Sequence, residues 1–170
     1  MDAIVYVSKT GFTQRYAEML SRELTLPVMS LDEARMKLGK GTQIIFLGWI
    51  SADRICGLPA ARKRYEVKAI GAVGLGPDND VQISRITKAN KPGGIPLFYL
   101  RGGFNMEKLD AFKRFVMKLF MKFVESDYKS GKHKMMSKEE GENMLESFNG
   151  PKDYVSYDNL APMLEKCRAL

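Results

Sequence analysis

The sequence predicts an α/β protein with a doubly wound, mainly parallel sheet of five strands and helices on both faces. Short apolar runs alternate with segments of helical periodicity, which is the order of a parallel sheet whose strands are connected by helices. The run at 42–49 is apolar without a break over 44–47, which is typical of a strand buried on both faces. With 170 residues, 45% of them hydrophobic, we expect one domain over 1–170.

The first hundred residues supply all five strands. The strands are expected at 3–8, 26–29, 42–49, 69–75 and 95–100. The helices between them are expected at 13–24, directly after Ser30, within 56–66 and at 80–89. Ser30 and Glu33 have the spacing of a capping box, in which each side chain bonds the backbone N–H of the other residue.

The remainder of the chain is expected to be mainly helical, without an internal repeat or an interdomain linker. A helix over 106–125 is followed by a polar, basic loop over 127–137. Ser137 and Glu140 make a second capping box before a helix at 138–148. Asp158 is expected to cap the final helix, with Pro162 inside its first turn, where proline is tolerated.

A short loop rich in hydroxyl groups joins the first strand to the first helix. The first N–H groups of a helix lack intrahelical partners and the helix dipole favours negative charge there, so this loop is a predicted anion site. Gly11 lets the backbone approach a phosphate closely. The candidate phosphate-binding residues are Ser8, Lys9, Thr10, Gly11, Phe12 and Thr13. The alternative is that Thr10 or Thr13 only caps the helix.

The loop fits the pattern [ST]-x-[ST]-G-x-[ST], with Ser8, Thr10, Gly11 and Thr13 at its fixed positions. In this respect the chain resembles the flavodoxin-like family, whose first loop binds the phosphate of flavin mononucleotide (FMN). The resemblance implies FMN as cofactor and the strand order 2-1-3-4-5. It also implies that the ligand lies beyond the carboxyl ends of strands one and three, where the strand order reverses.

A flavin also needs walls for its ring, and by fold logic the loops after strands three and four supply them. The first candidate wall contains Gly48, Trp49, Ile50 and Ser51. Trp49 or Ile50 would cover one ring face; the alternative is that Trp49 is the last core residue of its strand. The second candidate wall contains Gly76, Pro77 and Asn79, which a plain turn explains equally well.

Composition narrows the chemistry. His133 is the only histidine, and Cys56 and Cys167 have no metal or redox spacing. We therefore expect no metal and free thiols in a reducing cytoplasm, and no catalytic residue is assigned. No run is long enough to span a bilayer and no secretory signal is recognisable, so a cytoplasmic location is expected.

The formal charge of +7 favours an anionic partner. No nucleic-acid-binding motif accompanies the charge, so nucleic acid is not an expected partner. A basic surface without any specific partner is the alternative.

Residues 99–104 and the basic, methionine-containing helix that follows give a second clue. They look like the menaquinone-dependent protoporphyrinogen oxidase branch of the flavodoxin-like family. That resemblance implies quinone-linked oxidation of a porphyrinogen-like substrate, with helix 106–125 touching a membrane surface at its inner face or a hydrophobic redox partner. The alternative is that this helix packs its apolar stripe on the sheet and its lysines are solvated. Arg101 would pair with a substrate carboxylate or cap a strand end.

Three functions remain open from the sequence. The first is an FMN-dependent oxidoreductase, and the second is a flavodoxin-type electron carrier that only exchanges electrons with a protein. The third is a binding module of the same fold without flavin. The expected partners are a redox protein or a quinone, with a second copy of the chain, as a homodimer, left open.

Overall fold

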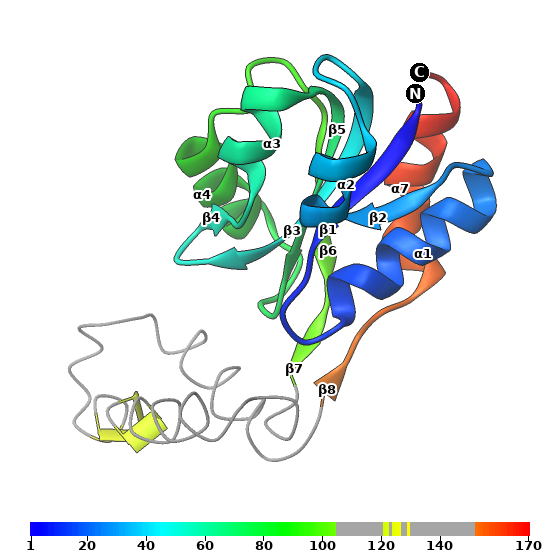
Figure 1. Ribbon diagram of the computed structural model, residues 1–170. Helices are drawn as coiled ribbons and strands as arrows, with labels where there is room; N and C mark the ends of the chain where they lie inside the picture. Colours follow the sequence, from blue (N-terminus) through cyan, green and yellow to red (C-terminus); the bar gives the residue numbers. More distant parts are fainter. Residues whose placement is uncertain (105–120, 123, 127–128, 130–151) are drawn as a thin grey trace. The chain divides into compact units, whose positions relative to one another are not determined.

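The computed structural model describes residues 1–104, 121–122, 124–126, 129 and 152–170 (Figure 1). The chain divides into two compact units, one made of Met1–Gly102 with Tyr154–Leu170 and the other of Gly103–Asp153. The single domain over 1–170 stays a prediction. The expected helix 106–125 and loop 127–137 lie mostly outside the described residues, and the expected helix 138–148 lies wholly outside them.

In the first unit, strands and helices alternate as the sequence predicts. The strands are β1 (Ala3–Val7), β2 (Val28–Ser30), β3 (Gln43–Ser51), β4 (Arg54–Ile55), β5 (Glu66–Gly74) and β6 (Leu97–Arg101). The helices are α1 (Phe12–Leu24), α2 (Leu31–Lys37), α3 (Leu58–Arg64), α4 (Asp80–Asn90) and α7 (Tyr157–Arg168). In the second unit, β7 (Gly103–Phe104) pairs antiparallel with β8 (Lys152–Asp153).

The α/β class and the mostly parallel open sheet are confirmed. The path of the sheet is β2-β1-β3-β5-β6, with parallel pairing at each step. The predicted count of five strands was wrong, because within the described residues the sheet has six strands. Strand β4 pairs antiparallel with the end of β3. Ala52 and Asp53 connect the two strands with φ of 46° and 63°, the positive values that a tight two-residue hairpin turn requires.

Alternating side chains along the strands feed two hydrophobic cores, one on each face of the sheet. On β1, Ala3 and Val5 belong to one core and Ile4 to the other. The first core includes residues of α2, α3 and α4, whereas the second includes residues of α1 and α7. Figure 1 shows α1 and α7 on one side of the sheet and α3 and α4 on the other. The expected burial of both faces of the third strand is confirmed by Ile44–Leu47, all fully buried.

Helix ends test the capping predictions. The Ser30–Glu33 capping box is present at the start of α2. The expected cap of the final helix was wrong, because Ser156, rather than Asp158, accepts a hydrogen bond from the backbone N–H of Asn159 at 3.2 Å. Helix α7 therefore begins at Tyr157, and Pro162 is its sixth residue, beyond the first turn.

The buried hydroxyl of Tyr16 connects α1 to β6 and to the segment before α7. It donates to the carbonyl oxygen of Arg101 at 2.7 Å and accepts from Asn159 Nδ2 at 3.2 Å. Asn159 Nδ2 also donates to the Tyr154 carbonyl at 2.6 Å. These bonds fix the start of α1 relative to the carboxyl end of the sheet.

We expect Tyr16→Phe to lower the free energy of unfolding by about 1–3 kcal/mol, because it leaves buried polar partners unsatisfied. Urea unfolding followed by circular dichroism measures the loss. Tyr157→Phe is the matched control, because Tyr157 is 48% exposed. Equal effects of the two substitutions would contradict the connecting role of the Tyr16 hydroxyl.

Candidate cofactor site

The strand register brings the predicted loops to one edge of the sheet. Val7 pairs with Gly48, and Trp49 pairs with Val73. The segments that follow β1 and β5, together with the β3–β4 hairpin, therefore meet at the carboxyl ends of parallel strands. This edge is where open α/β sheets bind their ligands.

The first loop ends at Gly11, whose φ of 92° is left-handed, and α1 starts at the next residue. No side chain caps this helix, so the alternative that Thr10 or Thr13 is its cap was wrong. By contrast, the side chains of Ser30, Asn79 and Ser156 cap α2, α4 and α7. Helix α3 also starts after a left-handed glycine, Gly57, without a side-chain cap, so the N-terminus of α1 is distinguished by the hydroxyl-rich loop that precedes it.

Hydroxyl groups line the approach to this terminus. Ser8 Oγ accepts a hydrogen bond from the Gly11 N–H at 3.1 Å, which holds the loop in a tight turn. Because a hydroxyl both donates and accepts, Ser8 keeps its proton for a ligand. Thr13 is buried, with 2% of its surface exposed, whereas Thr10 is half-buried and Lys9 is exposed.

Trp49 stands apart from the cores on both faces of the sheet. It is partly buried on β3, yet in the described part of the chain it packs against neither core, whereas Ile50 packs against the first. The alternative that Trp49 completes the core gains no support from these contacts. The Lys9 ammonium instead lies 4.8 Å from the centre of the Trp49 ring. Trp49 and Ile50 are the two candidates for covering a flavin ring. Because Ile50 packs against the first core, Trp49 is the better candidate.

Gly48 is explained by packing alone. A Cβ atom at this position would come within 2.5 Å of the Cys56 carbonyl oxygen and 2.6 Å of Ile55 Cγ2. The hairpin therefore requires glycine there, and Gly48 is buried beneath it. Ser51, by contrast, is exposed at the end of β3, where it pairs with Arg54.

Asn90, which the sequence analysis missed, fixes the hairpin. Its Oδ1 accepts from the Ile55 N–H at 2.8 Å, and its Nδ2 donates to the Asp53 carbonyl at 2.7 Å. The carboxylate of Asp53 also pairs with Arg85 at 3.1 Å. The hairpin that carries Trp49 is thus tied to α4 by polar contacts, and no local sequence pattern indicates this.

The second predicted wall, after β5, is partly explained by a helix cap. Asn79 Oδ1 accepts from the Gln82 N–H at 2.9 Å as the cap of α4. The Gly76 carbonyl accepts from the Tyr99 hydroxyl at 2.8 Å, which fixes the loop, and Pro77 is half-buried beside it. Gly76 itself has room for a Cβ atom, because the nearest neighbour would be 3.6 Å away. Packing therefore does not account for a glycine at position 76.

Arg101 stacks on an aromatic ring, and its expected pairing with a substrate carboxylate stays a prediction. Its guanidinium lies 3.8 Å from the centre of the Tyr154 ring, and its buried Nε has no hydrogen-bond partner among the described residues. Its neighbour Gly102 donates to the Gly74 carbonyl at 2.7 Å. A Cβ atom on Gly102 would lie 3.5 Å from Phe12 Cβ, so the end of β6 packs against the start of α1.

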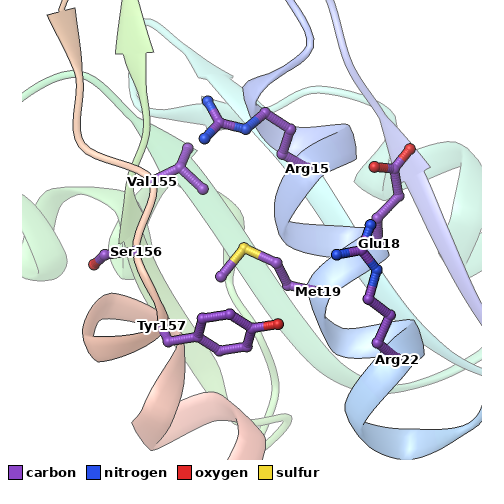
Figure 2. A pocket seen from close by; sticks show the side chains of 7 residues that line it. All are labelled: Arg15, Glu18, Met19, Arg22, Val155, Ser156 and Tyr157. Carbon is purple, nitrogen blue, oxygen red and sulfur yellow. The ribbon is translucent and has the colours of Figure 1, made fainter.

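A separate pocket of about 430 Å³ lies on another side of α1 (Figure 2). Helix α1 and the segment leading into α7 line it with Arg15, Glu18, Met19, Arg22, Val155, Ser156 and Tyr157. No predicted site residue contributes to this pocket.

Two searches within the described residues bear on other classes of site. They contain no group of three or more metal-ligating His, Cys, Asp or Glu side chains. In the same part of the chain, no helix is both long and apolar enough to cross a membrane.

No protein-family model matches the chain, and no curated protein matches it either.

The thiol of Cys56 offers a check on where the Lys9 ammonium lies. Burial raises the pKa of this thiol, and the Lys9 charge lowers it in part. Because the thiolate is the form that reacts, we expect Lys9→Met to raise the pKa further and to slow alkylation of Cys56 at mildly alkaline pH. Mass spectrometry of timed iodoacetamide reactions measures the rate.

Lys40→Met is the control for that experiment, because Lys40 is exposed at the opposite end of β3. Burial raises the pKa of Cys167 to about 11, so this thiol should react more slowly in every variant. Equal Cys56 rates in Lys9→Met and the unsubstituted chain would show that the ammonium does not lie beside the hairpin.

Proposed function

We propose that this chain is an FMN-binding redox protein with a flavodoxin-like fold. The observation that carries the proposal is the N-terminus of α1, which follows a left-handed glycine without a side-chain cap, at the sheet edge that also carries Trp49, a residue that packs against neither core in the described part of the chain. The parallel path β2-β1-β3-β5-β6 supports the fold assignment, since its order reverses between β1 and β3.

The residues present fit a phosphate monoester. The loop over 8–13 offers backbone N–H groups at a helix N-terminus, the hydroxyls of Ser8 and Thr10, and the Lys9 ammonium. All of these are donors to a dianion, and none needs a metal ion as an intermediary. The first turn of α1 also contains no acidic residue that would repel the ligand.

The ring would lie against Trp49, with its polar edge toward the loop that contains Gly76. FMN, when bound, supplies reversible electron transfer through its isoalloxazine ring. The chain's own contribution is to hold the phosphate, to orient the ring and to exclude water from one face. Because the flavin carries the electrons, the protein needs no general acid or base, and the candidate loops contain no histidine.

The narrower form of the proposal is quinone-linked oxidation of a porphyrinogen-like substrate. It is supported by the resemblance over 99–104 and in the basic segment that follows, most of which lies outside the described residues. The charge of +7 supports the second candidate, an electron carrier for an acidic redox protein. A reaction rate that falls steeply with salt favours the carrier, whereas strict dependence on a quinone favours the oxidoreductase.

Gly11→Val tests the cofactor assignment. A branched side chain at Gly11 would occupy the space that the phosphate needs at the start of α1. We therefore expect the affinity for FMN to fall by about tenfold to a hundredfold, which corresponds to the loss of one or two charge-assisted hydrogen bonds. Quenching of flavin fluorescence on titration with the protein measures the dissociation constant.

Gly41→Val controls for backbone strain. Gly41 has a φ of 78° and open space around its Cβ position, at the end of the sheet opposite the site. Both substitutions should cost about 1–3 kcal/mol of stability, but only Gly11→Val should weaken FMN binding. Unchanged FMN affinity in Gly11→Val, or equal losses in both variants, would refute the assignment.

A further inference from the structure

The contact between Lys9 and Trp49 joins the two halves of the candidate site. The ammonium lies 4.8 Å from the ring centre, within the range of cation–π attraction. Lys9 belongs to the predicted phosphate loop and Trp49 to the predicted ring wall. In this structure, therefore, a group suited to the phosphate covers the face suited to the ring.

The two partners differ in their freedom to move. Trp49 lies on β3 at the base of the hairpin, where its carbonyl accepts from the Cys56 N–H at 2.9 Å and Asn90 ties the hairpin to α4. Lys9 is exposed and has a flexible four-carbon stem with a compact charge at its end. The lysine is thus the partner that moves when a ligand enters.

The ring and the phosphate of FMN would each replace one partner of the Lys9–Trp49 contact. A planar ring stacked on Trp49 needs the face that Lys9 covers, and a phosphate in the loop attracts the same ammonium. The phosphate thereby provides the charged partner that Lys9 needs after it leaves the tryptophan. Riboflavin, which lacks the phosphate, would also displace the ammonium from Trp49, but it has no anionic group with which Lys9 could pair.

We propose that Lys9 makes the Trp49 face conditional on phosphate: it lowers the affinity for riboflavin, which must displace the ammonium without offering it a new partner, and it leaves the affinity for FMN nearly unchanged, because the phosphate replaces the lost contact. This inference rests on the proposed function and assigns Lys9 as a specificity-determining residue of that site. Unlike the loop pattern itself, it depends on the register of β1 against β3, which places Lys9 beside Trp49.

Binding constants for FMN and riboflavin test the selectivity. In Lys9→Ala, riboflavin should bind about two- to fivefold more tightly, because the loss of an exposed cation–π contact frees the ring face. The affinity for FMN should change by less than about twofold, because the freed ring face offsets the lost ion pair to the phosphate, so the ratio of FMN to riboflavin affinity should fall by about two- to fivefold. Lys9→Arg, which keeps both the charge and the stacking, should restore the preference for FMN.

A flavin-free measurement tests the contact itself. The chain has one tryptophan, so its intrinsic fluorescence reports on Trp49 alone. Quenching by neutral acrylamide should be stronger in Lys9→Ala than in the unsubstituted chain. Inorganic phosphate should raise quenching in the unsubstituted chain above a chloride control of equal ionic strength, and should have no effect in Lys9→Ala. Lys40→Met should behave as the unsubstituted chain in every assay.

The outcomes separate the two proposals. If FMN does not bind the unsubstituted chain, the proposed function fails and the selectivity fails with it. If FMN binds but Lys9→Ala leaves the ratio of FMN to riboflavin affinity unchanged, only the role of Lys9 is overturned. Equal acrylamide quenching in Lys9→Ala and the unsubstituted chain also overturns that role, whatever the flavin affinities are.

Discussion

The left-handed backbone at Gly11 is the constraint on which the candidate site depends. With a φ of 92°, it turns the chain from β1 into α1 within four residues, and it lets the helix start without a side-chain cap. The parallel pairing of β1 with β3, with Val7 opposite Gly48, then brings the loop that ends at Gly11 to the same edge of the sheet as Trp49. A longer connection, or a capping serine in place of the glycine, would separate or cover these groups.

The support around that turn comes from distant parts of the chain. The Tyr16 hydroxyl holds the first turns of α1 to the end of β6 and to Asn159, and Gly102, directly after β6, packs beside Phe12. On the other side, Asn90 holds the hairpin that carries Trp49. The phosphate loop and the hairpin therefore both rest on partly buried polar contacts, which are costly to break and keep the two segments in place.

The sequence predicted correctly those features that depend on residues close together in the chain. The alternation of apolar runs with periodic segments gave the α/β class, and the Ser30–Glu33 spacing gave a capping box that is present. Ser156 and Asp158 are both good caps, so only the backbone conformation of the folded chain could choose between them. Strand β4 was missed because its turn, Ala52-Asp53, lacks the glycine or asparagine that normally marks such a hairpin.

The candidate site shows the same division between local and tertiary information. The first loop is one continuous segment, so its pattern is visible in the sequence. Gly48 was grouped with the ring wall, although packing against Ile55 and Cys56 is enough to require glycine there. The contact of Lys9 with Trp49 spans forty residues and depends on strand register, which no local pattern encodes.

The central claim is that the first loop holds a phosphate monoester without a metal ion. Phosphorus NMR of FMN mixed with the 170-residue chain in the presence of EDTA observes that group directly. The account predicts a shifted resonance that stays in the dianionic form at pH values where free FMN takes up a proton. A resonance identical to that of free FMN, or a shift that disappears when EDTA is added, would contradict it.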